Sequence, residues 1–277
     1  SVIEACNFRC DYCMPADRVP DDYGLDSASR LTFDEIETLV RGFARVGIRK
    51  LRITGGEPLL RRNLPELVAR LVEVPGIEDL ALTTNGSLLA RQARALREAG
   101  LQRLTISLDA LDPEVFHRLS GGRGEVSKVL DGVRAAEDAG FDSIKFNCVI
   151  QRGINEDQAI PLVEHFRGSG HVLRFIEYMD VGATNQWRMD EVLPSAEVVK
   201  RLQTEFPLVP LQATAPGETA ERWGYAGSGG RHDPALGEVG FISSVTQAFC
   251  GDCNRARLSM DGKLFLCLFA GQGYDLR

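Results

Sequence analysis

The sequence predicts an α/β fold with a parallel sheet, either barrel-like or doubly wound, and a C-terminal extension of short antiparallel strands. Of the two arrangements we expect a partial (β/α)6-type TIM barrel. Short apolar runs alternate with helical patterns along most of the chain, and this alternation is typical of a parallel sheet. The rhythm changes after about Glu191, because Pro207–Gly240 is rich in Pro and Gly and predicts loops and short strands. A chain of 277 residues is long enough for one large domain, or for one domain and an extension.

The barrel elements are predicted in order from these runs. The expected parallel strands are Val2–Ala5, Lys50–Thr54, Asp79–Thr83, Arg103–Ser107, Ser143–Ile150 and Val172–Glu177. The expected helices between them are Thr32–Val46, Leu64–Glu73, Leu88–Ala99, Gly124–Ala139 and Asn155–Arg167. The first helix opens with Thr32-x-x-Glu35, which is a capping-box pattern.

Three antiparallel strands are expected near the end of the chain. They are Gly240–Val245, Arg255–Met260 and Lys263–Leu268, and a turn at Asp261-Gly262 joins the last two. We place a domain boundary near Leu193–Ser195, so that residues 1–194 form the barrel and residues 195–277 form the extension.

Polar side chains share one face of several predicted strands. Arg52 lies on the face opposite its apolar neighbours, and Lys145 and Asn147 do the same in a later strand. The apolar face must pack against helices, so the polar face points into the barrel, where Val, Ile and Leu are usual. Burial of unpaired Arg52 and Lys145 would be prohibitive. We therefore infer a wide, hydrated cavity for a charged ligand; the alternative is a sheet edge with one face in water.

The first cysteine set is Cys6, Cys10 and Cys13, with the spacing C-x3-C-x2-C. A 4Fe-4S cluster takes four thiolates as a rule, so three thiolates leave one iron open to bind a reactant. A structural zinc loop with a distant fourth ligand is the alternative. Cys148 shares the apolar face of its strand, so we expect a core residue there.

The second cysteine set is Cys250, Cys253 and Cys267, with the spacing C-x2-C-x13-C. It again supplies three thiols, and a zinc ribbon that lacks a ligand is the alternative. Arg255 and Arg257 follow directly and share one face if this run is a strand. Two guanidiniums on one face suit phosphate oxygens, although a solvated strand face would look the same.

The run Thr54-Gly55-Gly56-Glu57-Pro58 follows a predicted strand. Its two glycines would let a ligand approach the backbone closely, and its glutamate can accept a hydrogen bond from an ammonium group. Taken alone, such a run is more often a plain βα turn.

The bulk composition limits the partners. A net charge of −7 and a pI of about 5.3 argue against a nucleic-acid partner. No apolar run is long enough to cross a bilayer, so no membrane partner is expected. Seven cysteines without a disulfide-like framework suggest a reducing compartment, and we expect a cytoplasmic protein.

Together these motifs resemble the GTP 3′,8-cyclases, the molybdenum cofactor biosynthesis protein A family of the radical S-adenosylmethionine (SAM) superfamily. The likeness covers essentially the whole chain. The runs that carry it are Cys6–Pro15, Arg52–Pro58, Thr83–Gly86, Ser107–Asp109, Phe175–Gly182 and Cys250–Arg257.

The resemblance implies two 4Fe-4S clusters, the second of them carried by the C-terminal extension. It implies that the first is held by Cys6, Cys10 and Cys13, and the second by Cys250, Cys253 and Cys267. The residues implied to contact SAM are Tyr12, Gly56, Ser107 and Met179. The residues implied to contact GTP are Arg52, Thr83, Lys145, Arg174, Arg255 and Arg257, and the basic ones suit its triphosphate.

The implied reaction is the first step of molybdenum cofactor biosynthesis. A deoxyadenosyl radical from SAM abstracts hydrogen from the ribose 3′ carbon of GTP, and the product is (8S)-3′,8-cyclo-7,8-dihydroguanosine 5′-triphosphate. An electron donor is implied as a partner, and a homodimer is an open possibility. Two alternatives are a radical SAM enzyme that modifies peptides or sulfatases, and a non-catalytic metal-binding module that recruits a partner.

Overall fold

The computed structural model describes residues 1–14, 29–181 and 186–277. Pro15 and Gly182, the last residues of two of the motifs above, lie outside the described residues. The main sheet has eight strands, in the order β1-β2-β3-β4-β5-β8-β7-β6. Their bounds are β1 Lys50–Ile53, β2 Asp79–Thr84, β3 Arg103–Ser107, β4 Lys145–Ile150, β5 Val172–Glu177, β6 Leu208–Leu211, β7 Glu221–Tyr225 and β8 Glu238–Ile242.

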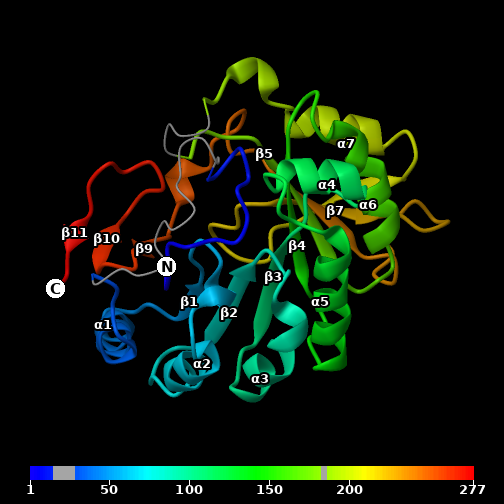
Figure 1. Cartoon of the computed structure of the whole chain (residues 1–277). Helices are drawn as coiled ribbons and strands as arrows, with labels where there is room; N and C mark the ends of the chain where they lie inside the picture. The colour runs from blue at the N-terminus through cyan, green and yellow to red at the C-terminus, as the bar shows by residue number, and fades with distance from the viewer. Residues whose placement is uncertain (15–28, 182–185) are drawn as a thin grey trace.

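Strands β1 to β5 and β8 run parallel, and β7 and β6 continue the sheet in antiparallel pairs. Helices cover the outer face of this curved sheet (Figure 1). They are α1 Phe33–Arg45, α2 Leu64–Val72, α3 Ala93–Glu98, α4 Pro113–Leu119, α5 Val126–Asp138, α6 Ala159–Phe166 and α7 Ser195–Leu202. Short 3-10 turns lie at η1 Pro58–Leu60, η2 Leu89–Arg91, η3 Glu156–Gln158, η4 Met189–Glu191 and η5 Cys250–Asp252. The fold is therefore the predicted partial barrel.

The two faces of the sheet differ in polarity, as the strand patterns predict. On the helix side, Leu82, Phe146 and Phe241 are fully buried in one continuous core. On the other side, Thr105 pairs in register with Lys145, and the next residues along, Asn147 and Arg174, also pair. Because β4 lies in the middle of the sheet, a sheet edge does not explain Lys145.

Two segments differ from the prediction, residues 2–5 and β8. Residues 2–5 are not a strand, although Val2 N donates to Thr54 O at 2.8 Å and the segment so lies beside the end of β1. The sixth parallel strand is β8, which was expected to be wholly antiparallel and instead pairs parallel with β5 and antiparallel with β7. The residues after the predicted boundary at 194/195 thus add β6, β7 and β8 to the same sheet.

A separate three-stranded antiparallel sheet ends the chain. It consists of β9 Arg257–Leu258, β10 Lys263–Phe265 and β11 Tyr274–Asp275, in the order β11-β10-β9. The predicted turn is confirmed: Gly262 has φ +92°, a conformation that glycine adopts readily. This sheet lies beside the N-terminal segment and α1 (Figure 1), since Ser1 N donates to Leu258 O at 2.5 Å.

Candidate functional site

The first cysteine set lies on a loop that several contacts fix in place. Arg9 is 1% exposed, and its Nη1 donates to the carbonyls of Cys6 at 2.7 Å and Phe8 at 2.9 Å. Cys13 N donates to Cys10 O at 2.9 Å and forms a tight turn. Cys6 and Cys10 are half-buried and Cys13 is exposed. The loop is held by its own backbone and by buried Arg9, and its thiols are left without disulfide partners.

A buried carboxylate, that of Asp109, lies close to these thiols. Tyr12 Oη donates to Asp109 Oδ2 at 2.7 Å, and Val149 N donates to Asp109 Oδ1 at 2.8 Å. Burial raises the pKa of Asp109 to about 6. Burial, followed by the charge of Asp109, raises the pKa of Cys10 well above its ordinary value. The environment therefore disfavours added negative charge and favours a cationic group beside the first set.

Glu57 differs from its predicted role. Its side chain is fully buried and accepts from Thr84 Oγ1 at 2.7 Å, Asn85 N at 2.7 Å and Leu59 N at 3.0 Å. Three protein donors leave little capacity for a ligand ammonium. Glu57 instead fixes the ends of β1 and β2 below the cysteine loop, and its charge adds to the effect of burial in raising the pKa of Cys6.

The glycine pair is also explained by the protein itself. A Cβ on Gly56 would lie 2.2 Å from Glu4 O, and one on Gly55 would lie 2.6 Å from Ile3 O. The N-terminal segment thus crosses the end of β1 at a distance that only glycine allows. Ser107 ends β3 and Met179 follows β5, and both are half-buried at the same edge of the sheet.

The inner face of the barrel holds a basic cluster of Arg52, Lys145 and Arg174. Arg52 Nη1 donates to Thr83 Oγ1 and to Thr105 Oγ1, both at 2.9 Å. Arg174 Nε donates to Asn147 Oδ1 at 3.0 Å. These partners are neutral, and within the described residues none of the three cations has a carboxylate within 4.0 Å.

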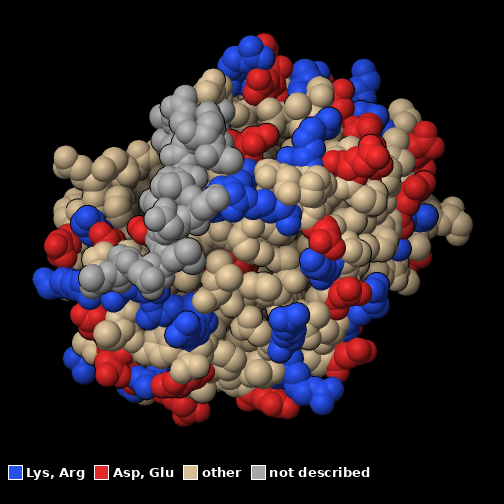
Figure 2. Space-filling view, in the orientation of Figure 1, with Lys and Arg blue, Asp and Glu red and all other residues tan. Residues whose placement is uncertain are grey.

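The members of this cluster repel one another. Burial, followed by the charges of Arg52 and Arg103, lowers the pKa of Arg174 to about 10. Burial and then Arg174 lower the pKa of Lys145, and the charge of Glu218 offsets only part of this. The cluster of Arg52, Lys145 and Arg174 is suited to a polyvalent anion. On the face of the molecule that Figure 2 shows, basic and acidic side chains are instead mostly interspersed.

The second cysteine set has a cationic environment. Arg255 Nη2 donates to Cys253 Sγ at 3.4 Å, and the backbone N–H of Arg255, followed by this contact, lowers the pKa of the thiol. The Nη1 atom of Arg257 is buried and has no hydrogen-bond partner in the part of the chain that the structure describes. Burial lowers the pKa of Arg257, and the charges of Cys253 and Cys267 oppose this effect. The set fits an anionic cluster, because the Cys253 thiol ionises easily and a buried donor lies close by.

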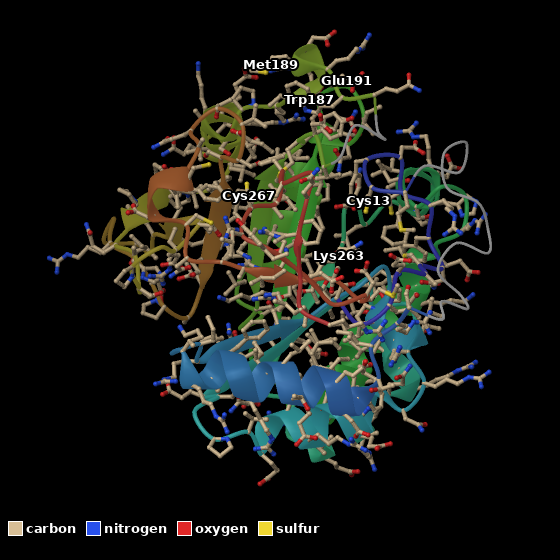
Figure 3. All side chains as sticks on the ribbon, turned by 90° about the vertical axis from the view of Figure 1, so that its left-hand side faces the viewer. Cys13, Trp187, Met189, Glu191, Lys263 and Cys267 are labelled. Atoms are coloured by element: carbon tan, nitrogen blue, oxygen red, sulfur yellow. The ribbon has the colours of Figure 1, made fainter. Side chains whose placement is uncertain are left out.

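In neither set are the thiols arranged around a common metal position. Over residues 1–14, 29–181 and 186–277, no three His, Cys, Asp or Glu side chains are placed to hold a metal ion. The thiols of the first set are nonetheless close enough to raise one another's pKa, as Cys6 and Cys13 do for Cys10. Figure 3 shows Cys13 and Cys267 on the same side of α1, with strands of the sheet between them in this view.

Comparison with known proteins decides the family. Residues 1–166 match the Radical SAM superfamily, and residues 171–277 match the family described as Molybdenum Cofactor Synthesis C. A GTP 3′,8-cyclase of Xanthomonas campestris pv. campestris (strain B100) is 64% identical over 277 residues, which are 100% of this chain and 80% of that protein. The chain belongs to the GTP 3′,8-cyclase family. A relative of the same name from Acidothermus cellulolyticus is 51% identical over 278 residues, with 100% of this chain and 75% of that protein covered.

Solved structures agree on the fold of this GTP 3′,8-cyclase family member. The structure of native anSMEcpe with bound AdoMet matches with a TM-score of 0.54 and 19% identity, over 74% of this chain and 58% of that chain. At this identity the match establishes the fold alone. It confirms the radical SAM barrel, and the two 4Fe-4S clusters and SAM follow from the family.

The predicted site residues lie in three places within this family member. Tyr12 lies in the first cysteine loop, and Gly56, Ser107 and Met179 lie at the ends of β1, β3 and β5 at one edge of the sheet. Arg52, Thr83, Lys145 and Arg174 line the inner face, and Arg255 and Arg257 lie at the second set. Sequence reasoning placed Asn147 on the polar face but did not foresee its hydrogen bond with Arg174. It gave no role to Asp109 or Glu177, although both lie in the quoted motifs. No described helix is long and apolar enough to span a membrane.

Proposed function

We propose that this chain converts GTP to (8S)-3′,8-cyclo-7,8-dihydroguanosine 5′-triphosphate, the first step of molybdenum cofactor biosynthesis, and that the residues named above carry the reaction. The observation that supports this best is the opposite charge around the two cysteine sets. Asp109 lies beside Cys10, whereas Arg255 and Arg257 lie beside Cys253. SAM carries a sulfonium and an ammonium group, and GTP carries a triphosphate, so each ligand has an environment of complementary charge.

On the SAM side, Cys6, Cys10 and Cys13 would hold the first cluster. When bound, the cluster and SAM supply the radical chemistry of the family. The chain's own part is positioning: Asp109 orients Tyr12 through its hydroxyl, and Gly56 can offer only backbone groups. Ser107 and Met179 would complete the SAM contacts from the edge of the sheet.

On the GTP side, Arg52, Lys145 and Arg174 would hold the triphosphate, since their charges have no ion-pair partner among the described residues. Thr83 supports Arg52 by accepting its hydrogen bond at 2.9 Å. Arg255 and Arg257 would hold GTP beside a second cluster on Cys250, Cys253 and Cys267. The basic face and the second set would thus fix the nucleotide at both ends.

Three finer points belong to the same proposal. An electron donor must reduce the first cluster, because the cleavage of SAM consumes an electron. The seven free thiols suit a cytoplasmic protein, and a homodimer is one assembly to test. We also keep the division into a barrel of residues 1–194 and a cluster-bearing region of residues 195–277.

Anaerobic reconstitution tests the proposal. We expect about eight irons and as many sulfides per chain. We also expect 5′-deoxyadenosine to form when both GTP and SAM are present and not when GTP is left out. Zinc in place of iron, with no SAM cleavage, would show instead a metal-binding module without this activity.

A further inference from the structure

One buried carboxylate outside the two ligand environments connects three separate parts of the molecule. Glu177 is the last residue of β5, and its side chain is 1% exposed on the helix-covered face of the sheet. Its Oε1 accepts from Ser195 N at 2.8 Å and from Thr246 Oγ1 at 2.6 Å. Its Oε2 accepts from Val245 N at 2.9 Å and Thr246 N at 2.8 Å.

These four donors use the whole accepting capacity of a carboxylate, which has about four lone-pair sites. Burial by itself would raise the pKa of Glu177, but the hydrogen bonds from Thr246, Ser195 and Val245 outweigh it and hold the pKa below its ordinary value. The carboxylate is therefore ionised and fully committed to protein donors. It has no capacity left to bind a ligand or to transfer a proton.

The segment that Glu177 holds is the loop of residues 243–249. This loop leaves β8 and leads into η5, where Cys250 lies four residues after Thr246. Thr246, Gln247 and Ala248 are exposed, so the loop has little apolar burial of its own. Among the described residues, every hydrogen bond that joins residues 244–246 to β5 ends on Glu177, including that from Ser244 Oγ to Glu177 O at 3.1 Å.

The same carboxylate also fixes the start of α7. Ser195 is the first residue of this helix, and Pro194 before it provides no side-chain cap. Glu177 satisfies the first free N–H of the helix and complements its dipole. The loop before Cys250 is thus attached to a rigid helix as well as to the central sheet, only two residues before Met179.

We propose that Glu177 is a positioning residue for the second cluster: it fixes the loop of residues 243–249 so that Cys250 and Cys253 lie within reach of Cys267. This rests on the proposed assignment of these three cysteines as ligands. Glu177 then acts through the loop and contacts neither ligand nor cluster.

The test separates the two clusters by the thiols that remain. In a Cys250→Ala/Cys253→Ala/Cys267→Ala background only the first set can bind iron, and in a Cys6→Ala/Cys10→Ala/Cys13→Ala background only the second can. We call these the first-set and second-set backgrounds, after the set that remains. Glu177→Gln keeps the shape of the side chain but removes its charge and turns an NH2 group toward backbone donors. In the second-set background we expect Glu177→Gln to lower the iron content from about four per chain to two or fewer. In the first-set background we expect it to leave the iron content unchanged.

Glu57→Gln is the matched control, because Glu57 is an equally buried carboxylate with three protein donors near the first set. It should leave the second-set background at full iron. Thr246→Val removes one hydroxyl donor at nearly constant volume and should lower second-set iron less than Glu177→Gln, while Thr246→Ser should restore it. Without metal, limited proteolysis at residues 243–256 should be several-fold faster in Glu177→Gln than in the parent protein.

Two outcomes would overturn the inference in different ways. Full second-set iron and parental proteolysis in Glu177→Gln, with Thr246→Val also unchanged, would remove the positioning role and leave the proposed function standing. No iron in the second-set background with Glu177 intact would mean that the ligand assignment itself is wrong, and the positioning role would fall with it.

Discussion

The two cysteine sets have the same number of thiols but lie in opposite surroundings. The first set is on a loop fixed by buried Arg9, and Asp109 raises the pKa of its Cys10 further than burial alone. The second set is exposed in this structure, and Arg255 lowers the pKa of its Cys253. The chain thus separates a region for positive charge from a region for negative charge before any cofactor is bound.

The difference has a structural cause. The first set lies over the carboxyl ends of parallel strands, where the short side chains of Ser107 and Asp109 end β3 and begin the next loop. The second set lies on a 3-10 turn and after a strand of three residues, in a region with few apolar contacts. The first site is built into the barrel, whereas the second depends on added attachments such as Glu177.

The largest effect on activity and iron content should come from the removal of a single thiol, in either set. Cys10→Ala and Cys253→Ala should each abolish cyclisation by more than about a thousandfold and each lose about four irons. Only Cys10→Ala should also lose SAM binding, measured by equilibrium dialysis under anaerobic conditions. Equal loss of SAM binding in both variants would contradict the separation of the two sets.

The Asp109 carboxylate beside the first set should make the free energy of unfolding depend on pH. The pKa of Asp109 is raised from 3.8 to about 6, so ionisation is harder in the folded chain than in the unfolded one. Below about pH 4 it is protonated in both states, and its contribution to stability is lost as the pH rises to about 6. Relative to Asp109→Asn, the metal-free protein should lose about 3 kcal/mol of unfolding free energy over this range. Parallel urea curves at each pH measure it, and a difference that does not change with pH would show that the pKa is ordinary.

Loss of a cation beside the second set should weaken GTP binding without affecting SAM. Arg257→Ala should raise the dissociation constant of GTP about tenfold to thirtyfold, as expected for a charge-assisted hydrogen bond. Arg41→Ala is the control, because Arg41 pairs with Glu37 on the exposed side of α1. Calorimetric titration of both ligands decides the matter, and an unchanged GTP constant would remove Arg257 from the site.

The smallest effect should come from the seventh cysteine. Cys148 is fully buried in the core, as predicted, and its Sγ lies 3.7 Å from Asp109 O. Cys148→Ala should cost about 1 kcal/mol of stability through a small cavity and leave the iron content of both sets intact. Iron analysis beside thermal unfolding tests this, and lost iron would mean that Cys148 is a ligand.

The barrel and the residues of the basic cluster could be predicted from the sequence. Alternation of polar and apolar residues placed Arg52 and Lys145 on one face, and register then brought Thr105 between them. The direction of β8 could not be predicted from the sequence. Its parallel pairing with β5 joins residues more than sixty positions apart and leaves no local pattern. The roles of Glu57 and Glu177 were missed for the same reason, since their donors come from distant loops.

Arg52 has one further consequence. Two threonine hydroxyls fix its guanidinium and neutralise none of its charge. In the unliganded barrel Arg52 and its basic neighbours therefore repel one another, and a bound polyanion would remove this repulsion. Nucleotide-free protein should therefore be the least stable form of the molecule, and its melting temperature should rise even with inorganic triphosphate.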